Sequence, residues 1–198
     1  ISVRNYAAGG WGNDFAIDQL ALYPQATAEF SLKVPEPGYE FVKSSDPVSG
    51  SQVLPNQVIT YTLTGSNTGD TDLATVIDDD LSDVFAHAEI VDGSLSAKVG
   101  DADVAAPVLD GSSLTWEGNV PAGQTVTVTY QVKVNSDAWG VEFKNHATSE
   151  ATPPGEDVPP ITPPPGETTH NTPTAPVTPT PIPTAQEESD TPKPVSYT

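Results

Sequence analysis

The stretch Thr125–Val134, with the sequence TVTVTYQVKV, decides the fold class. Apolar and polar residues alternate along it, so one face of an extended chain carries Val126, Val128, Tyr130, Val132 and Val134. This period of two is typical of a β-strand with a protein core on one side and water on the other. The stretch therefore predicts a long strand in an antiparallel sheet.

Six further stretches share this period and are bounded by Gly, Pro, Asn and Asp turns. They are 39–43, 58–63, 74–77, 88–91, 114–116 and 141–147. No stretch has the pattern of a long helix, although residues 80–87 can form one turn. Short strands with regular turns predict an all-β fold, an immunoglobulin-like antiparallel β-sandwich.

Composition divides the chain into three regions. The sandwich is predicted over 36–151, and residues 152–198 hold 14 of the 21 prolines, interleaved with Thr. Such a sequence cannot bury enough apolar surface to fold, so we expect a disordered Pro/Thr-rich stalk. Residues 1–35 include GNDFAIDQ, which resembles the closing strand of jelly-roll modules in secreted bacterial proteins. We therefore expect 1–35 to be the remnant of an upstream β domain with a linker.

The charge and residue content exclude several functions. The 198 residues include 7 Lys and Arg against 27 Asp and Glu, a formal charge of −20, so nucleic acid is a poor partner. No window is apolar enough for a membrane span. The absence of Cys excludes disulfides and thiolate chemistry. The absence of Met and the Ile start indicate a piece cut from a longer polypeptide.

Motifs for catalysis or metal binding are missing as well. His87, His146 and His170 lack metal-ligand spacing, and no nucleophile elbow or phosphate loop occurs. Asp14 and Asp18 supply only part of a calcium shell. We predict that the run of acids that includes 78–80 is a solvated acidic loop. The alternative is a calcium site or a pair of catalytic carboxylates. We expect no turnover enzyme, no cofactor and no metal.

Three polar residues share the inward parity of their strands. Tyr39, Phe41 and Lys43 alternate on one strand, and Phe143 precedes Asn145 on another. In the stretch 77–81 the inward parity falls on Asp79. Burial disfavours the charged forms of Lys and Asp, which gives a nucleophilic amine and a protonated carboxyl. The carboxyl can polarise the amide and move protons, so the expected product is an amide between Lys43 and Asn145. The alternative is that Lys43 reaches water at a strand end while Asn145 bonds to backbone.

An ordered set of motifs adds a resemblance over residues 36–151. The segments KSSDPVSGS from Lys43, VITYTL, NTGD, IDDDLSDV, LTW, AGQTVTVTY and FKN resemble the β-sandwich repeat modules of surface proteins from Gram-positive bacteria, especially actinobacteria. Many relatives among pilins and collagen-adhesin modules carry an intramolecular isopeptide bond. The resemblance implies Lys43 and Asn145 as the bonded pair and Asp79 as the acid that promotes the reaction. The choice among Asp78, Asp79 and Asp80 stays open.

These observations predict a structural spacer of a secreted, wall-anchored bacterial surface protein. Its partners are then the neighbouring domains of the same protein. Force would pass from the first strand through the new amide into the last strand. The alternative is an adhesin module that binds a carbohydrate or a host protein, with Trp11, Trp139 or the Asp-rich loop as contacts. An exposed aromatic platform or a pocket would favour that alternative.

Overall fold

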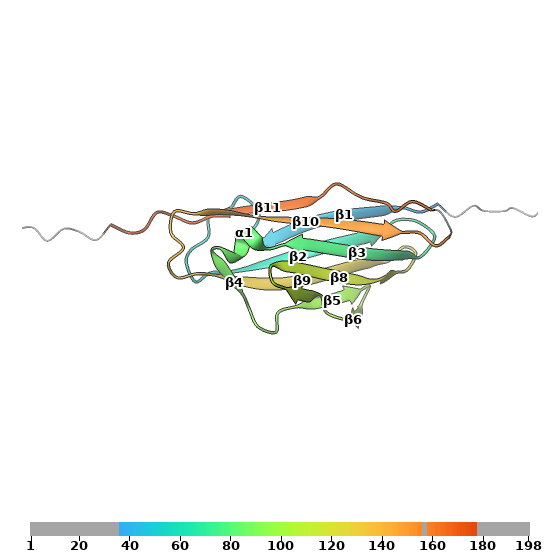
Figure 1. Cartoon of the computed structure of the whole chain (residues 1–198), viewed down its shortest axis with the longest axis horizontal. Coiled ribbons are helices and arrows are strands. Elements are labelled where there is room, and N and C mark those ends of the chain that lie inside the picture. The colour runs from blue at the N-terminus through green and yellow to red at the C-terminus, as the bar shows by residue number, and fades with distance from the viewer. Residues whose placement is uncertain (1–35, 156–157, 178–198) are drawn as a thin grey trace, which may run out of the picture. The chain divides into compact units, whose positions relative to one another are not determined.

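The computed structural model describes residues 36–155 and 158–177. Within these residues the regular secondary structure is β-strand apart from one helical turn (Figure 1). The elements are β1 (Tyr39–Asp46), β2 (Val58–Asn67), β3 (Leu73–Asp80), α1 (Ser82–Phe85), β4 (Ala88–Ile90), β5 (Ser96–Val99), β6 (Ala102–Val104), β7 (Val108–Asp110), β8 (Ser113–Val120), β9 (Thr125–Val134), β10 (Glu142–Thr152) and β11 (Gly166–Asn171). The predicted remnant at 1–35 lies outside the described residues.

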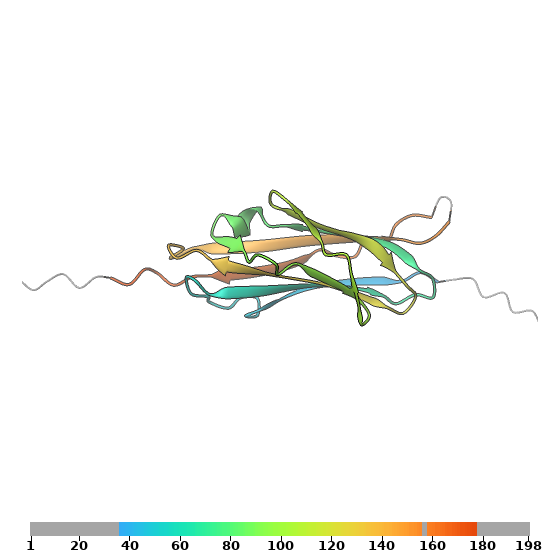
Figure 2. The same ribbon diagram turned by 90° about the horizontal axis from the view of Figure 1, so that it is seen from below.

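The strands form two antiparallel sheets that pack face to face (Figure 2). The first sheet has the order β1-β2-β9-β5-β6, with β4 also paired to β9. The second sheet has the order β11-β10-β3-β8-β7. The predicted all-β sandwich is therefore confirmed, and the sequence stretch that decided the fold class becomes β9, the centre of the first sheet.

The core lies between the sheets and follows the period of two. On β2 and β9 the inward residues are fully buried while their neighbours are partly exposed. The largest buried side chains include Ile59, Tyr61, Leu63, Tyr130 and Phe143. Burial of this alternating apolar set is the main force that holds the two sheets together.

The sandwich ends later than the sequence analysis predicted. Residues 166–171, assigned to the disordered stalk, form β11 and pair with β10 from Glu142↔Asn171 to Ala147↔Gly166. The loop after β1 covers the other side of β11, because Gly50 N donates to Thr169 O at 2.7 Å and Val53 N to Asn171 O at 2.9 Å. β10 is consequently an inner strand, and the expectation that it is the last strand is wrong.

Candidate functional site

Three strands bring Lys43, Asp79 and Asn145 into the interior of the sandwich. Lys43 lies on β1 of the first sheet, whereas Asp79 on β3 and Asn145 on β10 belong to the second sheet. Their exposed fractions are 8%, 1% and 0%. The alternation along each strand causes this burial: Val42, which precedes Lys43 on β1, points the other way and is 59% exposed. The inward parity predicted for all three residues is observed.

The register of the second sheet sets the distance between the acid and the amide. Asp79 lies opposite Ala147, and Asn145 is two residues further along the same face of β10. Residues placed diagonally in this way are within reach of one another's side chains. Lys43 then approaches from the opposing sheet, so the three groups bridge the two layers of the sandwich.

A continuous chain of hydrogen bonds joins the three groups through a fourth residue. Lys43 Nζ lies 2.5 Å from Asp79 Oδ2. The Tyr130 hydroxyl donates to the same carboxylate oxygen at 2.6 Å. Asn145 Nδ2 in turn donates to the Tyr130 hydroxyl oxygen at 2.6 Å. The alternative in which Lys43 reaches water and Asn145 bonds to backbone is therefore wrong.

Sequence reasoning placed Tyr130 in the apolar core and missed its polar role. Its inward parity on β9 is correct, but a buried Tyr also needs a partner for its hydroxyl. Two inward polar groups, Asp79 and Asn145, were already predicted for the same core. An inward Tyr in a core that also holds an inward acid and an inward amide was the signal that could have predicted these Tyr130 hydrogen bonds.

Two tyrosine rings line the space around the amine. Tyr61 and Tyr130 are register partners on β2 and β9, with ring centroids 5.2 Å apart. Lys43 Nζ lies 5.3 Å from the Tyr61 ring centroid and 6.0 Å from that of Tyr130. The ring faces favour a cation at this position. They also exclude water from the amine.

Burial moves the acid and the base toward their neutral forms. Burial lowers the pKa of Lys43 to about 8, although the charge of Asp79 opposes the change. Burial likewise raises the pKa of Asp79, against the effects of Lys43 and the Tyr130 hydrogen bond. A proton can therefore pass from the ammonium to the carboxylate at lower cost than in water. Such a transfer would leave a neutral amine, a carboxylic acid and an amide in the interior.

Two oxygens of the residues joined in this chain of hydrogen bonds, from Lys43 to Asn145, have no hydrogen-bond partner of their own among the described residues. They are Asp79 Oδ1 and Asn145 Oδ1, both fully buried. Buried polar atoms without a partner are rare in native proteins and need an explanation. Protonation of Asp79 turns its carboxyl into a donor, which can satisfy an amide oxygen and polarise its carbonyl.

Asp78 and Asp80, the two other acids of the sequence run, face water. Asp78 accepts a hydrogen bond from Thr115 Oγ1 at 2.7 Å, and Asp80 accepts one from Ser82 N at 2.9 Å. Hydrogen bonds to Ser82 lower the pKa of Asp80, which stays ionised. Of the three acids, only Asp79 faces the interior.

β11 closes the site on the side of Lys43. A Cβ atom at Gly166 would lie only 2.5 Å from Lys43 Cβ, so the two backbones approach as closely as glycine allows. Thr168 lies opposite Asn145 in the β10–β11 register and is 1% exposed. His170 is also buried, beside the rings of Tyr61 and Phe143. The sequence analysis assigned all these β11 residues to the stalk.

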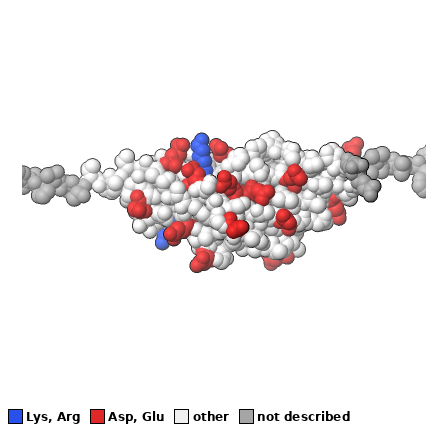
Figure 3. Space-filling model, in the orientation of Figure 1, with Lys and Arg blue, Asp and Glu red and all other residues white. Residues whose placement is uncertain are grey.

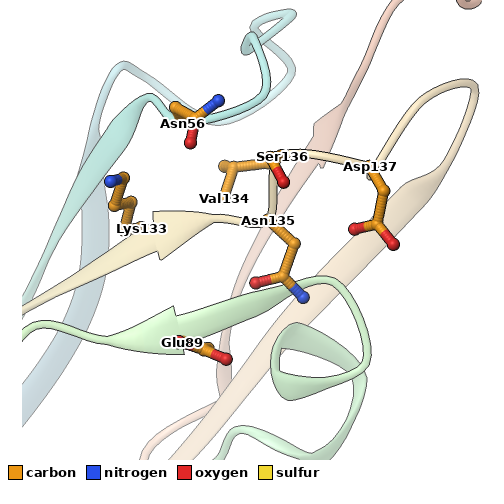
Figure 4. A pocket seen from close by; sticks show the side chains of 7 residues that line it. All are labelled: Asn56, Glu89, Lys133, Val134, Asn135, Ser136 and Asp137. Carbon is orange, nitrogen blue, oxygen red and sulfur yellow. The ribbon is translucent and has the colours of Figure 1, made fainter.

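The features that would favour a binding module are weak in the described residues. Trp139 is half-buried, and Trp11 lies outside the described part of the chain. Figure 4 shows the residues that line an open polar hollow, none of which has an aromatic ring. It is lined by Asn56, Glu89, Lys133, Val134, Asn135, Ser136 and Asp137.

Residues 36–155 and 158–177 contain neither a cluster of metal ligands nor a helix that could span a membrane. No group of three or more His, Cys, Asp or Glu residues there is arranged to hold a metal ion. Asp14 and Asp18 lie outside these ranges. No helix in the same ranges is long and apolar enough to cross a bilayer.

The fold is that of pilin domains. The full-length major pilin SpaD of Corynebacterium diphtheriae matches with a TM-score of 0.50 and 17% identity, over 66% of this chain and 34% of the pilin. BcpA, the major pilin subunit of Bacillus cereus, matches with a TM-score of 0.51 and 15% identity, over 67% of this chain and 40% of BcpA. The chain thus spans well under half the length of these pilins. At such identities the likeness shows the fold alone.

A family model matches residues 38–174, which is most of the chain. The chain therefore belongs to the family described as a domain of unknown function, DUF7927. The matched range includes β11 together with the rest of the sandwich. No curated protein matches the chain.

Proposed function

We propose that the sandwich is a load-bearing spacer of a bacterial surface protein and that it joins Lys43 to Asn145 by an intramolecular isopeptide bond. The observation that carries the proposal is the buried chain of contacts from Lys43 through Asp79 and Tyr130 to Asn145. An amine, an acid and an amide rarely meet in an apolar core, because each costs free energy to bury. A covalent bond between Lys43 and Asn145 would explain why these groups are buried together.

The reaction uses the groups as they lie. Lys43 Nζ gives a proton to Asp79 Oδ2, the atom that it already contacts. The neutral amine attacks Cγ of Asn145, and protonated Asp79 gives up its proton for the leaving nitrogen. The Cγ–Nδ2 bond breaks, and Nδ2 leaves as ammonia. Asp79 takes up the second proton lost by the Lys43 nitrogen and then returns to carboxylate as ammonium forms. One peptide-like bond is gained and one ammonia is lost, and the protein acts on itself once.

The product would have a mechanical use. It would tie β1 of the first sheet to β10 of the second, so the two layers could not slide apart without breaking a covalent bond. A chain without Cys has no disulfide for this purpose. The pilin-type fold supports a structural or adhesin role at a cell surface. We propose the spacer role, without turnover or cofactor, in a secreted wall protein of a Gram-positive, actinobacterial cell.

The surface charge supports a role among crowded copies. Acidic side chains are spread over the whole face shown in Figure 3, with few basic ones among them. The full chain carries a formal charge of −20. Like charges keep closely spaced molecules apart and soluble. The expected partners are the neighbouring domains of the same surface protein.

Intact-mass spectrometry tests the proposed function. The native chain is expected to be lighter than its sequence by one ammonia. Lys43→Ala, Asn145→Ala and Asp79→Ala should each restore the sequence mass, whereas Lys98→Ala should keep the deficit because Lys98 forms only an exposed pair with Asp103. Fragmentation of a proteolytic digest should locate the branch at Lys43 and Asn145. A native mass equal to the sequence mass would overturn the proposal.

A further inference from the structure

The Tyr130 hydroxyl occupies the position between the acid and the leaving group of the proposed reaction. It donates to Asp79 Oδ2 at 2.6 Å and accepts from Asn145 Nδ2 at 2.6 Å. Lys43 contacts the same Asp79 oxygen at 2.5 Å. The hydroxyl therefore connects the atom that receives the first proton with the nitrogen that must leave.

Departure of that nitrogen is the difficult step of the reaction. An amide nitrogen leaves only after it has gained a proton, and the interior holds no solvent path to supply one at a 0% exposed residue. Among the described residues, the hydrogen-bond partner of Asn145 Nδ2 is Tyr130, whereas Asp79 meets Lys43 and Tyr130. A proton held on Asp79 Oδ2 thus has a route to Nδ2 through one hydroxyl.

We propose that Tyr130 is a catalytic proton relay for isopeptide formation, an inference that rests on the proposed function. After Lys43 Nζ has given its proton to Asp79 Oδ2, Asp79 donates to Tyr130 Oη while Tyr130 gives its own proton to Asn145 Nδ2. The two hydrogen bonds reverse direction, and the hydroxyl ends the step as it began. The Cγ–Nδ2 bond then breaks with both electrons on nitrogen, which leaves as neutral ammonia.

The surroundings hold the relay in place and keep it protonated. The Tyr130 ring is fully buried and packs against Tyr61 with centroids 5.2 Å apart. Burial and the nearby charge of Asp79 raise the pKa of Tyr130 well above its ordinary value. The group therefore does not ionise at neutral pH, and it can pass a proton only by taking another in the same step.

Tyr61 provides a matched control within the same cluster. It is equally buried and is the direct register partner of Tyr130. Its hydroxyl lies near the Asn145 side chain, but it forms no hydrogen bond with Asp79 and so does not connect the acid to the leaving nitrogen. Loss of either hydroxyl leaves the ring packing intact, but only the loss at Tyr130 interrupts the route from Asp79 to Asn145.

The test measures the rate of ammonia loss after folding. The full chain is made by brief cell-free synthesis, quenched in urea before it folds, and refolded by dilution over a range of pH. Timed samples are denatured in acid and analysed by intact mass. Tyr130→Phe is expected to slow the loss by about a hundredfold, the usual size of a general-acid contribution. Tyr61→Phe keeps the ring beside Lys43 and the route through Tyr130, so it should slow the loss far less than Tyr130→Phe does.

The pH profile separates a relay from mere support. Without the internal relay, the leaving nitrogen can gain its proton only when a local opening of the sandwich admits solvent, so the residual rate of Tyr130→Phe should fall as the pH rises. A purely structural role predicts the native profile at a lower amplitude, and that result would overturn the relay. If Tyr130→Phe does not fold, difluorotyrosine at 130 keeps the hydroxyl but makes it more acidic, and an unchanged rate would likewise overturn the relay.

The outcomes also separate this inference from the proposed function. In one outcome the native chain forms the bond and Tyr130→Phe forms it as fast as Tyr61→Phe. That outcome leaves the isopeptide proposal intact and removes the relay. A native chain that never loses ammonia removes both. Linking in the native chain, slow linking in Tyr130→Phe and a changed pH profile would support both.

Discussion

Replacing Lys43 by Met should lower the stability of the sandwich by several kcal/mol. Met keeps an unbranched apolar stem in the interior and removes the amine, so no bond to Asn145 can form. The bond would enclose 145 minus 43, or 102, residues. By the chain-entropy relation for cross-links, a loop of that length contributes about 4.7 kcal/mol by restricting the unfolded state.

Loss of the amine itself should add little to this value. In the linked native chain the Lys43 nitrogen is an uncharged amide, so the substitution breaks no Lys43–Asp79 ion pair, whereas removing one partner of an intact buried pair would cost about 3–5 kcal/mol. Asp79 thus lacks a cation in both chains, and burial raises its pKa and favours the protonated form. The change in loop entropy therefore dominates, and the melting temperature should fall by about 10–20 °C.

Urea unfolding followed by tryptophan fluorescence measures the effect. Lys43→Met should unfold at a lower urea concentration and with a steeper dependence on urea, since an unlinked unfolded chain exposes more surface. The matched control is Lys98→Met, because Lys98 is 55% exposed and pairs with Asp103 at 3.1 Å on the surface. An exposed pair contributes at most about 1 kcal/mol. Equal midpoints for the two variants would refute the covalent clamp.

Two further predictions concern β11 and pH. Gly166→Ala places a Cβ 2.5 Å from Lys43 Cβ and 3.1 Å from Lys43 N, so β11 must move away. We expect the free energy of unfolding to fall by about 1–3 kcal/mol, measured from the urea midpoint. An unchanged midpoint would contradict the close approach of the two backbones. In unlinked Asn145→Ala, burial sets the folded-state pKa of Lys43 to about 8 against an ordinary 10.5. The unfolded chain then binds more protons between these values, so stability should rise with pH across that window. The linked native chain, whose Lys43 no longer titrates, should lack that rise, and equal pH slopes for the two chains would contradict the bond.

The sequence was sufficient for the fold class because the long strands follow a strict period of two, although β5, β6 and β7 lie outside the stretches predicted as strands. Alternation also placed Lys43, Asp79 and Asn145 inward, since a strand that buries its apolar neighbours has only two faces. Parity cannot, however, say which inward groups touch across the two sheets. The Lys43–Asp79 contact joins opposing sheets, and the sheet packing that sets it is not encoded in any one strand.

β11 was missed for a different physical reason. Its sequence, GETTHN, has no apolar residue, so hydrophobic alternation gives no signal. Its inward positions hold Thr168 and His170, which are polar groups that other elements bury. His170 Nε2 reaches the carbonyl of Pro47 at 3.0 Å, a contact across 123 positions of sequence. Tertiary packing therefore overrides a composition that on its own predicts a stalk.

The position of β11 changes where a pulling force would act. The described chain enters and leaves at opposite ends of the sandwich (Figures 1 and 2). An amide between Lys43 and Asn145 would carry the load from β1 to β10, and the enclosed loop would bear none of it. The residues after Asn145 stay in the load path, because β10 continues to Thr152 and the chain returns as β11.

That remaining segment is itself well placed to resist. β11 is antiparallel to β10, so a pull on its outgoing end runs along the strand and loads the whole hydrogen-bond ladder together. The loop after β1 adds bonds on the other edge, from Gly50 N to Thr169 O and from Val53 N to Asn171 O. The proposed covalent bond would therefore protect the bulk of the sandwich, while non-covalent pairing of β11 would limit how far the module extends. A first strand and a last strand joined directly would have no such extensible segment.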